Sequence, residues 1–122
     1  MKKIWLILKV VLAIFLTFGG VQHFISPNNY IPFVPSVLPF TLAIIYLFGL
    51  FEILFGLALF FKKLETIGAW GILILMLLFL PIHIWDVFSN TPAIGSHNAA
   101  LIRLLIQFVL IFIAWKVKNN VL

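Results

Sequence analysis

Four long apolar stretches are the feature of this chain that most limits its fold. They cover about residues 4–25, 40–61, 66–88 and 98–115, and only short connections separate them. A helix needs roughly 20 apolar residues to cross the hydrocarbon core of a bilayer, so each stretch is long enough. We therefore expect an all-α, integral membrane four-helix bundle that forms a single domain over residues 1–122.

The composition leads to the same class. Hydrophobic residues make up 65% of the chain and charged residues only 9%, which is too little polar surface to cover a water-soluble globule. The sequence contains no cysteine, which excludes disulfides, thiolate nucleophiles and cysteine-bound iron–sulfur clusters. The histidine and acidic residues match no recognised metal motif, so we expect no metal site and no intrinsic cofactor.

The first stretch has a second interpretation, as a cleaved signal peptide. Two lysines before an apolar run, as in MKKIWLILKVVLAIFLTFGG, are typical of such peptides. Against this, Lys9 interrupts the apolar run, no clear small-x-small cleavage site follows, and the hydrophobicity continues through Val21. We treat the segment as a permanent span.

Basic residues predict the orientation in the membrane. The connections 26–39 and 89–97 contain no lysine or arginine, whereas lysines occur at both ends of the chain and in the remaining connection: Lys2, Lys3, Lys9, Lys62, Lys63, Lys116 and Lys118. The positive-inside rule then places both termini in the cytoplasm. We expect the membrane to be the cytoplasmic membrane of a prokaryote. Anionic lipid headgroups, and not nucleic acid, are the expected partners of these lysines, and Lys9 is expected to extend back to that surface.

Polar residues inside the four spans predict a site in the outer half of the bundle. His83 and Asp86 are three residues apart and Arg103 and Gln107 four, so each pair shares a helix face. We expect Asp86 to pair with Arg103, and Glu52 to be protonated or paired with a protonated histidine. The candidate proton-exchanging residues are Glu52 and His83, and the candidate ligand-binding residues are Gln22, His23, Tyr30, Asp86, Arg103 and Gln107. The alternative is that these groups only hold the bundle together through hydrogen bonds.

Three local patterns bear on the site. Gly49 and Gly56 flank Glu52 at i−3 and i+4, which predicts close approach of a neighbouring helix. Pro81 removes a backbone donor beside His83 and predicts a bend with a modest cavity. The connection SPNNYIPFVPSVLP is uncharged and rich in proline, and it is either a lid at the outer interface or an ordinary crossover.

Four segments of the chain resemble the signatures of the DoxX-like family of small four-span membrane proteins. They are GGVQHFISPNNYIPFVPSVLPF, YLFGLFEILFGLALF, GILILMLLFLPIHIW and RLLIQFVLIFIAW. The matching positions are His23, Phe24, Pro27, Tyr30, Gly49, Glu52, Gly56, Pro81, Arg103 and Gln107. The chain departs from the family pattern at His83, where an asparagine is common.

The resemblance implies a place in or beside a membrane redox system, because the family is named after a subunit associated with thiosulfate:quinone oxidoreduction. We then expect a quinone or lipid-like ligand, with Glu52 and His83 exchanging protons and Arg103 orienting an oxygen. Expected partners are membrane lipids, another membrane or redox subunit, or a second copy of the chain. Two alternatives stay open: a non-catalytic membrane subunit or assembly partner, and haem ligation by His23 and His83. Whether the chain is an enzyme also stays open.

Overall fold

The computed structural model describes residues 2–120, and over these residues it contains helices and no strand. Four long helices follow one another: α1 (Lys2–Ile25), α2 (Thr41–Ala58), α3 (Glu65–Phe88) and α4 (His97–Asn120). Two short 3-10 turns, η1 (Pro27–Asn29) and η2 (Ile31–Phe33), lie between α1 and α2. All four helices are long and apolar enough to cross a membrane, so the expected all-α four-helix membrane bundle is confirmed. Residues 1, 121 and 122 of the expected single domain lie outside the described residues.

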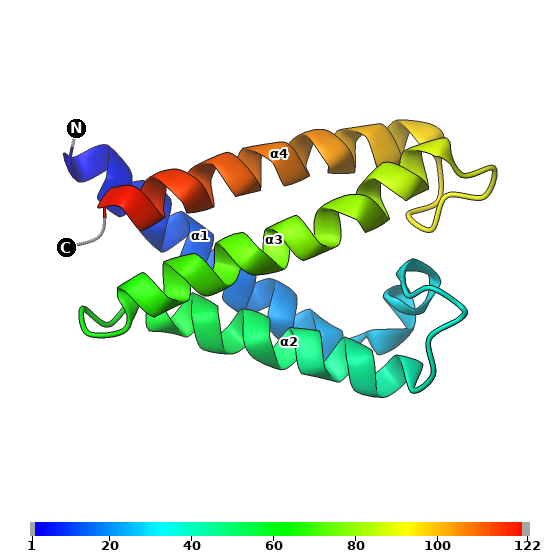
Figure 1. Cartoon of the computed structure of the whole chain (residues 1–122), viewed down its shortest axis with the longest axis horizontal. Coiled ribbons are helices and arrows are strands. Elements are labelled where there is room, and N and C mark those ends of the chain that lie inside the picture. The colour runs from blue at the N-terminus through cyan, green and yellow to red at the C-terminus, as the bar shows by residue number, and fades with distance from the viewer. Residues whose placement is uncertain (1, 121–122) are drawn as a thin grey trace.

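The helices run up and down and form two hairpins. α1 packs most closely on α2, and α3 on α4, while the contacts between the hairpins are fewer. Both ends of the chain lie at the same end of the bundle as the α2–α3 connection (Figure 1). The α1–α2 and α3–α4 connections lie together at the opposite end, where the two hairpins diverge (Figure 1).

The second span is shorter than predicted. We expected it to reach Phe61, but α2 ends at Ala58, because the next three N–H groups bond to carbonyls only three residues back. These tight turns carry Leu59 into the core, where it is 1% exposed, and leave Lys62 and Lys63 exposed in the connection. The fourth helix instead runs past Trp115 to Asn120, since neither glycine nor proline interrupts it there.

The apolar core fills the half of the bundle that holds the chain ends. Its members come from the middle of α1, the first half of α3, the second half of α4 and the turn after α2: Leu12, Ala13, Leu16, Leu59, Ala69, Ile72, Leu73, Leu75, Met76, Leu110, Ala114 and Val117. Burial of such side chains stabilises a fold by roughly 1.5–3 kcal/mol each in water, and in lipid the same close packing acts mainly through van der Waals contact. The opposite half is therefore the part of the bundle that is free to hold a site.

Glycines bring α1 and α2 into backbone contact beside that half. A Cβ atom added at Gly20 would lie 2.6 Å from the carbonyl oxygen of Gly49, and one at Gly49 would lie 2.5 Å from the Cβ of His23. A Cβ at Gly56 would lie 2.6 Å from Thr17 Oγ1. Only glycine allows this approach, which agrees with the small-residue pattern around Glu52 and sets Glu52 against α1.

We expected Lys9 to extend back to the membrane surface, but it pairs with an acidic residue inside the bundle instead. Its Nζ lies 2.8 Å from Oε2 of Glu65, at the first turn of α3. Glu65 is only 3% exposed, so the pair joins α1 to α3 near the end of the bundle that carries the termini. A buried carboxylate within reach is a better partner for the ammonium than distant headgroups.

Candidate functional site

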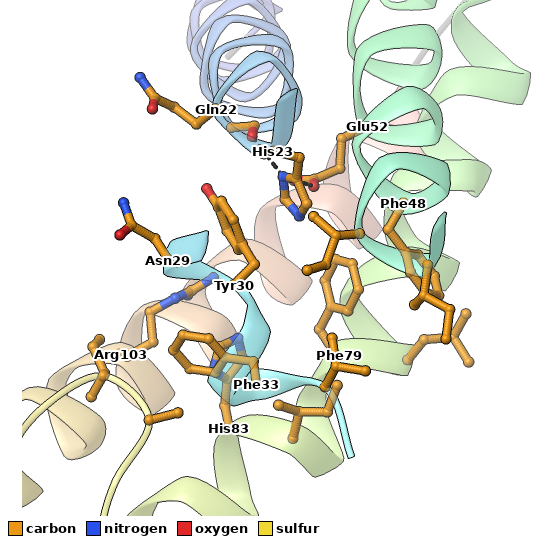
Figure 2. Close-up of a pocket in the computed structure, with 18 of the residues that line it drawn as sticks. Gln22, His23, Asn29, Tyr30, Phe33, Phe48, Glu52, Phe79, His83 and Arg103 are labelled. Atoms are coloured by element: carbon orange, nitrogen blue, oxygen red, sulfur yellow. Dashed lines mark hydrogen bonds and ion pairs between the residues drawn. The ribbon is translucent and has the colours of Figure 1, made fainter. Parts of the chain in front are cut away.

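A pocket of about 800 Å³ lies between the two hairpins, at the end of the bundle opposite the chain ends. Its walls come from all four helices, from the α1–α2 connection and from the α3–α4 connection (Figure 2). Most of the wall is apolar, with five phenylalanines: Phe15, Phe18, Phe33, Phe48 and Phe79. The volume falls in the range of small-molecule pockets, about 300–1,000 Å³.

Six of the eight residues that we expected at a site line this pocket. They are Gln22, His23, Tyr30, Glu52, His83 and Arg103. Asp86 and Gln107 lie outside its wall and have other partners. Gln22 sits at the edge, with its side chain turned away from His23 (Figure 2).

His23 and Glu52 form a polar contact on the pocket wall. Both residues are buried, and Nδ1 of His23 lies 3.1 Å from Oε2 of Glu52. The same Nδ1 lies 2.8 Å from the carbonyl oxygen of Gly19, which takes its hydrogen bond. Oε2 of Glu52 is therefore close to the ring but without a hydrogen-bond partner. The pairing of Glu52 with a histidine is one of the two arrangements that we predicted.

The α1–α2 connection covers the polar residues. The ring of Tyr30 stacks on His23 at a centroid distance of 3.9 Å and an angle of 16°, and Phe33 packs edge-on against His83 at 5.9 Å. The two 3-10 turns aim both aromatic side chains into the pocket (Figure 2), which favours a lid over an ordinary crossover. Both imidazole rings are packed against the lid, an arrangement that does not favour a haem between them.

Tyr30 is the titratable group that the lid adds to the pocket. Burial raises the pKa of its hydroxyl, the charge of Glu52 adds to this effect, and Arg103 opposes it. The phenol therefore stays protonated and can donate a hydrogen bond into the pocket.

Arg103 and His83 each present a buried nitrogen without a partner. Nη1 of Arg103 and Nδ1 of His83 have no hydrogen-bond partner in the described part of the chain. The guanidinium extends from α4 toward the segment that carries Asn29 and Tyr30 (Figure 2). The site thus holds one guanidinium nitrogen and one imidazole nitrogen for which the described residues supply no hydrogen-bond partner.

The expected pair between Asp86 and Arg103 is not formed. The carboxylate of Asp86, in the last turn of α3, accepts hydrogen bonds from the backbone N–H groups of Ala93 and Ile94, the latter at 3.3 Å. The α3–α4 connection folds back over Asp86 and offers these two donors, which satisfy a carboxylate without a cation. Asp86 therefore holds the α3–α4 connection against the end of α3 through these hydrogen bonds.

Gln107 does not line the pocket and connects two helices instead. Its side chain is fully buried, and Nε2 donates a hydrogen bond of 2.7 Å to the carbonyl oxygen of Met76 on α3. Met76 itself belongs to the pocket wall. Gln107 thus ties α4 to α3 at the pocket's inner boundary.

The aromatic wall is the part of the site that our sequence interpretation missed. A single phenylalanine in an apolar span carries no signal, but the spacing does. Phe18 precedes Gln22, Phe48 precedes Glu52 and Phe79 precedes His83, each by four residues, so each polar residue shares its helix face with an aromatic one. This repeated pairing on three spans could have predicted an aromatic wall.

No metal-ligand cluster accompanies the pocket. Over residues 2–120, no group of three or more His, Cys, Asp or Glu residues is placed to hold a metal ion. The chemistry that the site offers is therefore that of Arg103, the two histidines, Glu52 and the Tyr30 hydroxyl.

Comparison with known proteins gives one family. A family model described as a domain of unknown function (DUF8561) matches residues 12–118, which include every residue that lines the pocket. Neither the curated proteins nor the solved structures gave a match.

Proposed function

We propose that the pocket of this chain, which belongs to the DUF8561 family, binds a small amphipathic molecule. The apolar part of the molecule lies against the phenylalanine walls, and its oxygen-bearing head group lies at Arg103. Quinones and lipid-like molecules both belong to this class.

The unpartnered Nη1 of the Arg103 guanidinium is the observation that carries the proposal. A buried donor without a partner costs about 1–3 kcal/mol, and a charged one more, so a site that keeps one is suited to a ligand that supplies the acceptor. Nη1 of Arg103 is such a donor, and Arg103 lines a pocket that is otherwise mainly apolar. A few convergent polar groups in an apolar cavity are typical of small-molecule sites.

The outer parts of the wall support access from the lipid. Phe18 on α1 is 63% exposed and Leu78 on α3 is 54% exposed, and both also line the pocket. In a membrane such residues face hydrocarbon, so an amphipathic molecule meets an apolar entrance on these faces.

The polar residues give the bound molecule a partner for proton exchange. Nδ1 of His23 and Oε2 of Glu52 lie 3.1 Å apart, so the charge of each residue affects the titration of the other, and His83 lines the same pocket with an Nδ1 that has no hydrogen-bond partner in the described part of the chain. Proton exchange at Glu52 and His83 fits a role beside a membrane redox system, which is also what the resemblance to the DoxX-like family implies. That resemblance and the redox partner stay predictions, and we propose them together with an orientation that places both termini in the cytoplasm.

The experiment fills the pocket with one side chain. Ile82 lines the pocket on α3, so Ile82→Trp should displace the bound molecule. Native mass spectrometry of gently extracted protein should show a retained small amphipathic molecule in the parent chain and its loss in Ile82→Trp.

The matched control is Ile84→Trp, the same substitution two residues further along α3. Ile84 is 37% exposed and does not line the pocket, so this variant should keep the molecule. Equal retention by both variants would place the molecule on the outer surface of the bundle, and a parent chain that retains nothing but annular lipid would remove the proposal.

A further inference from the structure

The charges on the pocket wall can be counted from its contacts. The ionisable residues that line the pocket are His23, Tyr30, Glu52, His83 and Arg103. The contact between His23 and Glu52 at 3.1 Å makes them one titrating pair, and a pair that holds one proton is neutral whether the proton is on the ring or on the carboxyl group. Tyr30 keeps its proton, because burial raises its pKa. When the pair holds that proton, the wall carries no unbalanced negative charge.

Arg103 is the cation that this count leaves over. Its guanidinium forms no ion pair within 4.0 Å in the described part of the chain, and Nη1 has no hydrogen-bond partner there. The acidic residue that we had expected to pair with it, Asp86, uses its carboxylate on the N–H groups of Ala93 and Ile94 and does not line the pocket. The pocket therefore presents a positive charge to whatever occupies it.

We propose that the occupant is a single-chain amphiphile with an ionised carboxylate, which pairs with Arg103 while its hydrocarbon chain lies along the phenylalanine wall. This inference rests on the proposed function and names the class of molecule within it.

The chemistry of the guanidinium favours an acid over a neutral head group. Its planar fork of N–H donors matches the two oxygens of a carboxylate, and such charge-assisted bonds are about twice as strong as neutral ones. A quinone oxygen or an alcohol would accept a hydrogen bond but would leave the buried charge without a counter-ion. An inorganic anion would supply the charge but would leave the apolar walls uncovered. A fatty-acid-like molecule satisfies both parts of the pocket.

The test compares two probes that differ only in the head group and adds a quinone as a third probe. Radiolabelled hexadecanoate and hexadecanol are bound to the purified full chain in a neutral detergent, at a pH where the acid is ionised, with decylubiquinone as a neutral quinone. A hydrogen bond to a charged group is stronger than one to a neutral group, so we expect hexadecanoate to bind at least about tenfold more tightly than hexadecanol.

Arg103→Gln removes the charge and keeps an amide donor on a shorter side chain. It breaks no ion pair or hydrogen bond that the folded chain makes through Nη1, so it should fold. We expect its affinity for hexadecanoate to fall about tenfold, to that of hexadecanol, and its affinity for hexadecanol to stay unchanged. Lys63→Gln is the control, because it removes a positive charge from the exposed α2–α3 connection at the other end of the bundle, and it should change neither affinity.

Each result separates this inference from the proposed function. Equal affinity of the parent chain for the acid, the alcohol and the quinone would overturn the acid and leave an amphipathic ligand in place. A preference for the acid that persists in Arg103→Gln would overturn the assignment to Arg103. Binding of none of the three probes would overturn both. If Arg103→Gln does not fold, the ratio of acid to alcohol affinity in the parent chain decides by itself.

Discussion

At the scale of single residues, Glu52 and Arg103 show how differently two ionisable groups in apolar helices can be placed. Glu52 has a partner on α1, because its Oε2 lies 3.1 Å from Nδ1 of His23. Arg103 has no such partner at Nη1, and the acidic residue expected to pair with it is occupied by backbone amides. Glu52 therefore belongs to the protein's own network, and Arg103 is the group that we propose to face a ligand.

Glu52→Gln tests whether this network exchanges protons. Glutamine keeps the size and the hydrogen-bonding capacity of a protonated glutamic acid but cannot release a proton. Oε2 of Glu52 accepts no hydrogen bond from the described residues. The free energy of unfolding of the variant should therefore lie within about 1 kcal/mol of that of the parent chain. It should still bind hexadecanoate, but the number of protons exchanged on binding should differ from that of the parent chain.

Calorimetry in two buffers with different heats of ionisation measures that proton number. The acid itself exchanges protons with the buffer equally in both proteins, so the difference between them isolates Glu52. Identical proton numbers for the two proteins would assign Glu52 a purely structural role.

At the scale of the helices, the contact between α1 and α2 decides where the site can form. The backbone approach at Gly20 and Gly49 sets the Cβ of His23 against α2, one turn before Glu52. Thr17 and Gly56 continue the same contact toward the core. Any side chain that separates the two helices should therefore separate His23 from Glu52 as well.

Two neighbouring glycines of α1 give a matched pair of variants. A Cβ at Gly20 would lie 2.6 Å from the Gly49 carbonyl oxygen and 2.9 Å from the Ile53 nitrogen, which are backbone atoms and cannot move aside. A Cβ at Gly19 would lie 3.3 Å from Oε1 of Glu52, at the end of a flexible side chain. Overpacking of this kind costs about 1–3 kcal/mol, so Gly20→Ala should lower the unfolding free energy by that amount.

Gly19→Ala is the control in the same thermal or denaturant unfolding experiment. It should stay within about 0.5 kcal/mol of the parent chain, as substitutions without a clash usually do. If both variants unfold alike, α1 and α2 are not in backbone contact at Gly20.

The sequence predicted the helices well and the contacts between connections poorly. Long apolar runs set the four spans, and the spacing around Glu52 predicted its close approach to a neighbouring helix, because both depend on residues near one another in the sequence. The partner of Asp86 could not be predicted in this way, since it depends on how the α3–α4 connection folds back to present two N–H groups. The stacking of Tyr30 on His23 depends in the same manner on the path of two 3-10 turns.

At the scale of the whole molecule, polarity is divided between the two ends of the bundle. The lysines near both chain ends and in the α2–α3 connection lie at one end, beside the apolar core (Figure 1). The pocket and the two uncharged connections lie at the other end. A molecule with this asymmetry has a preferred orientation in a membrane, because lysine-rich connections stay on the cytoplasmic side.

Reporter fusions test that orientation directly. A reporter inserted after Lys63 should report a cytoplasmic location, because Lys62 and Lys63 are exposed in the α2–α3 connection and resist translocation. A reporter at the C-terminus should read the same side, since four spans return the chain to the side where it began. A reporter within residues 89–97 should read outside, because this connection contains no lysine or arginine. Agreement between the 89–97 fusion and the other two would mean that α3 and α4 do not both cross the membrane, and the pocket would then lie on a different side of the bilayer from the one that we propose.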